Sequence, residues 1–293
     1  MAQAQPAQPN VLPPRLLYHK HITGGRRPLD LSLREVWRYR DLVLLFTRRD
    51  FVVQFKQTIL GPLWIFLTPV ITSLMYAFVF GNVAGISTDG VPKVLFYLAS
   101  TAAWTFFAAC VNGCAETFTS NAQVMSKVYF PRLVVPLSIM LSAACRFLLQ
   151  MIPVLGFFAY HLVRGEVSTS PAWWLLVPVC LLHLGLLGLG CGIIVSALTT
   201  KYRDLSVLVK FGVSLWMYAS PVVYPLSALP AAARTIVLLN PATVPIELLR
   251  QALWQHATVT PGAIILSWAV TLVVVLVGIT LFNRVERVFA DTV

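Results

Sequence analysis

The sequence predicts an all-α polytopic membrane protein: six transmembrane helices, an N-terminal amphipathic interface helix, and short re-entrant helices before the last span. Three observations predict this fold class. Apolar residues make up 58% of the 293 residues and charged residues only 11%, against roughly 25% in soluble domains. Several uncharged stretches reach the length of about 20 residues that a helix needs to cross a bilayer. Prolines interrupt the apolar region before the last of these stretches.

The N-terminal part of the chain is polar and divides into two segments. Residues 1–29 are rich in Pro, Gln and Ala and lack the apolar core of a cleavable signal, which predicts a disordered cytoplasmic tail. Residues 30–56 place charged side chains on one helical face and Leu33, Trp37 and Leu44 on the other. This pattern predicts a helix in the cytoplasmic interface that leads into the first span.

A transmembrane domain is expected over residues 57–285, followed by a cytoplasmic tail at 286–293. Six apolar stretches are predicted to cross the bilayer. They cover residues 60–80, 94–115, 133–163, 171–200, 211–233 and 257–283. Arg146 stands about 13 residues into the third stretch, near its middle, where a charge should face the bundle interior or water.

The region 221–255 is apolar but contains five prolines. They are Pro221, Pro225, Pro230, Pro241 and Pro245. Because proline breaks the hydrogen-bond ladder of a helix, we expect two short helices that dip into the membrane and return. A surface loop is the alternative interpretation.

The positive charges predict the orientation of the chain. Of the 22 Lys and Arg residues, seventeen fall on the side shared by the two termini and four on the other. The positive-inside rule therefore puts both termini in the cytoplasm. The net charge of +11 then faces anionic lipid headgroups, so nucleic acid is not needed as a partner.

Neither a metal site nor a catalytic site is expected. The five cysteines lie inside apolar stretches without metal-site spacing, and we interpret them as small hydrophobic residues. A membrane-embedded enzyme that processes glycans would need grouped carboxylates. Four of the eleven acidic residues lie within 30–50 and the others are scattered singly. This pattern disfavours the enzyme interpretation without removing it.

Three stretches resemble the membrane subunit of bacterial type-2 ABC exporters of polysaccharides. They are "RRDFVVQFKQTILGPLW", "LFYLASTAAWTFF" and "NAQVMSKVYFPRLVVPLS", and "YRDL" at 202–205 fits the same pattern. The likeness runs from about residue 30 to 285 and is greatest to O-antigen exporters, with capsule and teichoic acid exporters as relatives. One departure is Gln54-Phe55, where many relatives have a basic residue followed by tyrosine.

This resemblance implies a transporter subunit with defined partners. Two copies of the chain would join two copies of a separate ABC ATPase in the bacterial inner membrane. The complex would move an undecaprenyl-diphosphate-linked polysaccharide from cytoplasm to periplasm. The chain has no G-x-x-x-x-G-K-[ST] phosphate loop, so ATP and Mg²⁺ are expected on the partner and no cofactor here. Another cargo, such as capsule, teichoic acid, a drug or a lipid, is the alternative.

The loop 116–132 would receive the energy of ATP hydrolysis, because the resemblance identifies it as a coupling helix that docks on the ATPase. A short amphipathic helix with protruding apolar side chains makes a compact interface anchor. The expected coupling residues are Glu116, Met125, Lys127, Val128, Tyr129, Phe130 and Arg132. A solvated connector or a membrane-interface anchor is the alternative interpretation.

Two groups of residues are predicted to meet the substrate. Guanidinium and ammonium groups bind phosphate, and the lipid diphosphate is expected at Arg40, Arg48, Arg49 and Lys56. Aromatic rings stack on sugars, and the translocation channel is expected to use Trp104, Phe106, Phe107, Arg146, Trp216, Tyr218 and Tyr224. The alternatives are positive-inside anchoring for the cations, lipid-facing bulk for the rings, and helix packing for Arg146.

Overall fold

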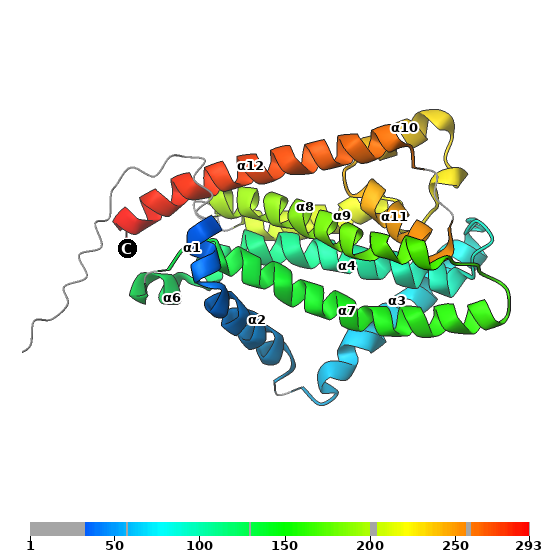
Figure 1. Cartoon of the computed structure of the whole chain (residues 1–293), viewed down its shortest axis with the longest axis horizontal. Coiled ribbons are helices and arrows are strands. Elements are labelled where there is room, and N and C mark those ends of the chain that lie inside the picture. The colour runs from blue at the N-terminus through cyan, green and yellow to red at the C-terminus, as the bar shows by residue number, and fades with distance from the viewer. Residues whose placement is uncertain (1–32, 57, 129, 200–203, 256–258, 293) are drawn as a thin grey trace, which may run out of the picture.

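The computed structural model describes residues 33–56, 58–128, 130–199, 204–255 and 259–292, and these form a helical bundle without strands (Figure 1). Within these described ranges, five helical units are long and apolar enough to cross a membrane. They are Gly61–Val83, α4 (Lys93–Ala115), α7 (Val134–Val163), Pro171–Thr199 and α12 (Pro261–Thr292, apolar to Val285). The predicted fold class of an all-α polytopic membrane protein is confirmed.

Two of the five units contain more than one kind of helix. Gly61–Val83 consists of the 3₁₀ turn η1 (Gly61–Leu63), α3 (Trp64–Tyr76) and a π-helical segment, η2 (Ala77–Val83). The left-handed φ of +50° at Gly61 makes the turn into the membrane, which explains a glycine at this point. The fourth unit joins the 3₁₀ turn η3 (Pro171–Leu175) to α8 (Leu176–Thr199).

The expected boundaries of the fifth span, residues 211–233, are wrong. The helix in this region is α9 (Leu205–Tyr218), which begins earlier, stops before Pro221, and is shorter than a membrane crossing. The helix ends there because Pro221 sterically disfavours the helical conformation in the residue before it. The described residues contain five candidate crossings, and six only if the two bent helices within residues 231–254 together form one broken span.

Three short helices follow α9 in the proline-rich segment. They are η4 (Leu226–Ala228), α10 (Ala231–Leu239) and α11 (Thr243–Trp254). The axes of α10 and α11 differ by 104° across a short break, a geometry that a broken span and a re-entrant loop share. The re-entrant interpretation of residues 221–255 stays a prediction.

Helix α4 is the core of the bundle, and its side chains are mostly buried against α3, α7 and α8. Close approach of α8 explains its run of glycines. A Cβ on Gly192 would lie 2.4 Å from Cys114 Cβ, and one on Gly188 would lie 2.6 Å from Cys110 Cβ. Small residues at such contacts are typical of helix pairs in membranes, where close backbone packing replaces the hydrophobic effect.

The predicted interface helix forms two helices, α1 (Leu33–Arg38) and α2 (Arg40–Phe55). Helix α2 packs against α7, burying Phe46 and Thr47, and the Thr47 hydroxyl donates to the Ser138 carbonyl (3.3 Å). In Figure 1 α2 and α3 form a V whose open side faces α7.

One end of the bundle carries α1, α6 (Ala122–Lys127) and the C-terminal end of α12 (Figure 1). The expected tail at 1–29 lies outside the described residues. The expected tail at 286–293 is largely a continuation of α12, which remains helical through Thr292.

Candidate functional site

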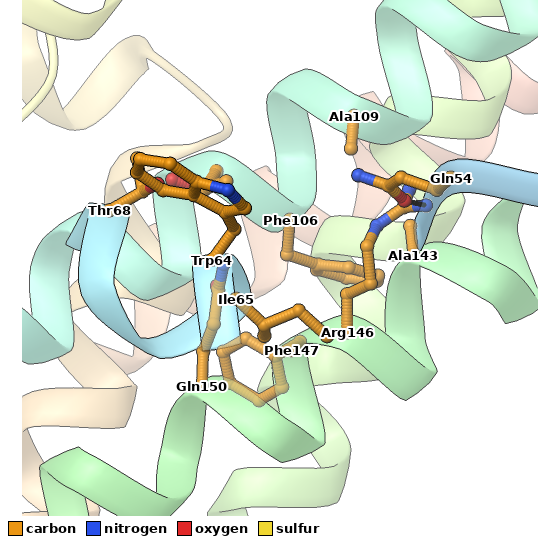
Figure 2. A pocket seen from close by; sticks show the side chains of 11 residues that line it. Gln54, Trp64, Ile65, Thr68, Phe106, Ala109, Ala143, Arg146, Phe147 and Gln150 are labelled. Carbon is orange, nitrogen blue, oxygen red and sulfur yellow. Dashed lines mark hydrogen bonds between the residues drawn. The ribbon is translucent and has the colours of Figure 1, made fainter. Parts of the chain in front are cut away.

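A pocket of about 460 Å³ lies between the end of α2, the start of α3, and the facing sides of α4 and α7 (Figure 2). Its polar and indole-bearing lining residues are Gln54, Trp64, Thr68, Thr105, Arg146 and Gln150. Its apolar lining residues are Ile65, Phe106, Ala109, Ala143 and Phe147. The pocket is therefore amphipathic, with one guanidinium group among polar and aromatic side chains.

Arg146 reaches the pocket from α7 and meets Gln54 of α2 (Figure 2). Its Nη1 donates to Gln54 Oε1 (2.7 Å) and, with longer geometry, to Ser142 Oγ one turn earlier (3.4 Å). The side chain is half buried. Among the described residues, these two hydrogen bonds are the ones that Arg146 makes, and both use the same nitrogen.

Arg146 lies beside the start of one span and the middle of another. It shares the pocket with Trp64 and Ile65, at the start of the first span, and with Thr105 and Phe106, near the middle of α4. A charge within the membrane should face the bundle interior or water, and Arg146 faces a pocket. Its expected position near mid-membrane stays a prediction.

The apolar part of the pocket is made by two packed phenylalanines. The rings of Phe106 and Phe147 are buried with centroids 5.6 Å apart. Trp64, near the start of the first span, is 46% exposed. The pocket can accordingly accept a polar group beside Arg146, and the Trp64 indole is its most exposed aromatic surface.

The structure separates the residues predicted to line the channel. Phe106 and Arg146 share the pocket. Trp104, Phe107 and Trp216 pack together elsewhere, with centroids 5.1 to 6.3 Å apart, and Trp216 Nε1 donates to Asn240 Oδ1. The other two expected residues are Tyr218, which is exposed, and Tyr224, which is half buried. The channel assignment of these residues stays a prediction.

The cations predicted for the lipid diphosphate differ in their surroundings. Arg40, Arg48 and Lys56 are exposed. Arg49 is already engaged, because its Nη2 lies 2.7 Å from Asp50 Oδ1 and its guanidinium stacks on a phenylalanine ring of the same helix. This ion pair also offsets the negative charge of Asp50, which lies one helical turn before the pocket residue Gln54.

A second pocket, of about 680 Å³, lies between α2 and the predicted coupling loop. Its lining includes Arg49, Glu116 and Asn121. Arg49 Nη2 donates to Asn121 Oδ1 (3.4 Å), and Lys210 of α9 pairs with Glu116 (2.6 Å). Glu116 therefore connects the start of the loop to α9, whereas Asn121 connects it to α2.

The predicted coupling side chains do not all protrude. Met125 and Phe130 are buried, and the Phe130 ring packs edge-on against Phe46 of α2 (5.7 Å). These two side chains hold the loop to the bundle, so their expected protrusion is wrong. Lys127 and Val128 are exposed, Val128 at 57%. Arg132 is half buried and engaged, and Tyr129 lies outside the described residues.

A buried ion pair, Glu247 with Arg250, was missed by the sequence interpretation. Arg250 Nη1 lies 2.5 Å from Glu247 Oε1, and both side chains are at most 5% exposed. Arg250 also donates to Ser100 Oγ of α4 and to the carbonyls of Pro221 and Val222. The sequence did carry a signal for this pair, because Glu247 and Arg250 are three residues apart in an apolar stretch and would be neighbours on one helical face.

The geometry of the pocket fits the binding of an anion. Within the described ranges, no three His, Cys, Asp or Glu residues group as metal ligands. Arg146 offers a charged, planar donor group in a half-enclosed pocket, and such groups match phosphate oxygens in pairs.

Comparisons with known proteins agree on one family. The sequence profile described as "ABC-2 type transporter" matches residues 41–254. Two Klebsiella pneumoniae proteins, each named "O-antigen export system permease protein RfbA", are 26% and 28% identical over 251 residues, covering 86% of this chain and 94% of each relative. A Myxococcus xanthus protein of the same name is 28% identical over 265 residues, covering 89% of this chain and 98% of that relative.

Proposed function

The chain belongs to the ABC-2 type transporter family, and we propose that it is the permease subunit of an exporter of lipid-linked O-polysaccharide. The family match confirms the resemblance drawn from the sequence motifs. The observation that carries the cargo assignment is that all three relatives described above, aligned over nearly their whole length, are named O-antigen export permeases.

In this proposal the exporter is driven by a separate ATPase. Two copies of the chain pair with two copies of an ABC ATPase, which holds ATP and Mg²⁺, in the bacterial inner membrane. Both termini face the cytoplasm. The polysaccharide, carried on undecaprenyl diphosphate, moves from the cytoplasmic to the periplasmic side.

The coupling loop supports the proposed route of energy transfer. Lys127 and Val128 present an exposed surface, while Glu116 and Asn121 join the same loop to α9 and α2. A displacement of the loop by the ATPase would be transmitted through these contacts to α9 and α2. The buried pair Met125 and Phe130 would keep the loop from moving independently of the bundle.

Deletion of the gene tests the cargo. We expect lipid-linked O-polysaccharide to accumulate on the cytoplasmic face of the inner membrane, where inside-out vesicles expose it to a glycan-specific antibody. Expression of the wild-type chain should restore polysaccharide at the cell surface. Normal surface polysaccharide in the deletion strain would contradict the assignment, and accumulation of a different glycan would move it to another polysaccharide.

Charge reversal tests the coupling surface separately. The double variant Lys127→Glu, Val128→Glu should insert normally but lose ATP-driven export, because two carboxylates would replace the exposed docking surface. Arg164→Glu, at the exposed turn after the opposite end of α7, is the matched control and should export normally. Full export by the double variant would place energy transfer elsewhere.

A further inference from the structure

The Arg146 guanidinium has binding capacity that the fold does not use. Within the described part of the chain, its hydrogen bonds to Gln54 and Ser142 both come from Nη1. The edge formed by Nε and Nη2 is a planar pair of donors of the kind that binds two phosphate oxygens at once. A half-buried arginine of this kind contrasts with one whose donors are all satisfied by protein.

The rest of the pocket fits the part of a lipid where headgroup and chain meet. The Gln54 amide, Thr68 and Gln150 supply polar groups to the pocket. Phe106 and Phe147 form a packed apolar wall behind them, and Trp64 adds an exposed aromatic side chain. Figure 2 shows Arg146 and Gln54 on one side of the pocket and Trp64 and Thr68 on the other. A group that is only charged would leave the exposed Trp64 indole unused.

We propose that this pocket binds the phosphate group of a lipid in the cytoplasmic leaflet, with Arg146 as the paired donor. The lipid is either the polyprenyl diphosphate of the substrate, an identification that rests on the proposed function, or a resident phospholipid. Asp50 also acts electrostatically on Arg146, and its ion pair with Arg49 at 2.7 Å reduces its repulsion of a phosphate. Exposed Arg40 and Arg48 would attract the headgroup, but screening by water and salt limits their contribution.

Binding to the full chain in complex with its ATPase tests the proposal. Dodecyl maltoside is the detergent of choice because it carries no phosphate. The probes are undecaprenyl diphosphate, undecaprenol and phosphatidylglycerol, and the readout is the dissociation constant. Wild-type protein should bind undecaprenyl diphosphate at least tenfold more tightly than undecaprenol. Arg146→Gln should weaken diphosphate binding roughly ten- to hundredfold, as expected for loss of charge-assisted hydrogen bonds.

A substitution of Gln54 leaves Arg146 in place. Gln54→Glu puts a carboxylate on the guanidinium and should weaken binding as much as Arg146→Gln does, without disturbing packing. The charge control is Arg164→Gln at the exposed turn after the far end of α7, which should leave affinity unchanged. Wild-type affinity in both Arg146→Gln and Gln54→Glu would overturn the proposal.

The probes also distinguish the two lipid sources. Tighter binding of undecaprenyl diphosphate than of phosphatidylglycerol, by tenfold or more, would support a substrate site. Equal affinity, lost equally in Arg146→Gln, would support a site for a resident phospholipid. Failure of the deletion strain to accumulate polysaccharide would remove the proposed function while leaving this binding result intact.

Discussion

Arg146 and Arg250 both stand in apolar segments, yet their surroundings are opposite. Arg250 is 2% exposed and donates to Glu247, Ser100 and the Pro221 and Val222 carbonyls. Arg146 is half buried, opens on a pocket, and uses one of its nitrogens for hydrogen bonds within the described residues. An arginine whose donors are satisfied by protein supports the fold. One whose donors face a pocket is available to a ligand.

The contacts of Arg250 explain why the chain keeps a charge pair there. They join α11 to α4 through Ser100, and to the turn after α9 through Pro221. The guanidinium also lies over the Phe96 ring, 4.0 Å from its centroid. Three segments distant in sequence are thus held at one point in a region that prolines keep from forming one continuous helix.

The largest predicted effect is on stability, in Arg250→Ala. Removing one partner leaves Glu247 as an uncompensated buried charge, a change that costs about 3–5 kcal/mol in other proteins. The melting temperature of the purified complex in detergent should fall sharply, and little folded protein should accumulate. A melting temperature equal to that of wild type would show that Arg250 does not support the fold.

A double variant separates the loss of charge balance from the loss of contacts. Glu247→Leu with Arg250→Met removes both charges and keeps apolar volume, which is often close to neutral for buried pairs. We expect the melting temperature of this double variant to be higher than that of Arg250→Ala. The opposite order would mean that the contacts of Arg250 with Ser100 and Pro221 matter more than the pairing of charges.

An intermediate effect is predicted for Ser100→Ala. The Ser100 hydroxyl accepts from Nε (3.1 Å) and Nη2 (2.8 Å) of Arg250, and its loss leaves buried charged donors with fewer acceptors. The expected cost is about 1–3 kcal/mol, again read from the melting temperature. Ser214→Ala, at an exposed serine of α9, is the matched control and should change stability little.

The smallest effect on stability is predicted for Arg146→Gln. The change removes hydrogen bonds to Gln54 and Ser142 at a half-exposed site, so the expected loss is under about 1 kcal/mol. The melting temperature in the absence of lipid should stay close to that of wild type. A loss as large as that of Arg250→Ala would make Arg146 a second structural arginine and erase the contrast.

The long spans were predictable from sequence because continuous apolar stretches leave few alternatives. Helices α4 and α7 begin within a residue of their expected starts at 94 and 133. The end of α9 was placed too late because hydropathy continues through Pro221 while the helix does not. An apolar sequence predicts that a segment is buried in lipid or protein, but it does not predict whether the backbone of that segment stays helical.

The site was less predictable because it depends on contacts between distant segments. The sequence singled out Arg146 as a charge in a span, but its depth and its contact with Gln54 depend on how α2 packs beside α7. Protruding side chains were expected in the coupling loop, but Met125 and Phe130 turn inward. In both places the outcome depends on partners more than 80 residues away in the chain, such as Phe46 for Phe130.

The most direct test is the shift in melting temperature caused by undecaprenyl diphosphate in wild-type and Arg146→Gln complexes. A ligand at about 100 times its dissociation constant stabilises the folded state by about 2.7 kcal/mol. Wild type should therefore melt at a higher temperature with the lipid, whereas Arg146→Gln should start from nearly the same melting temperature and gain little. A full lipid-dependent shift in Arg146→Gln would contradict the assignment of the open arginine to a ligand.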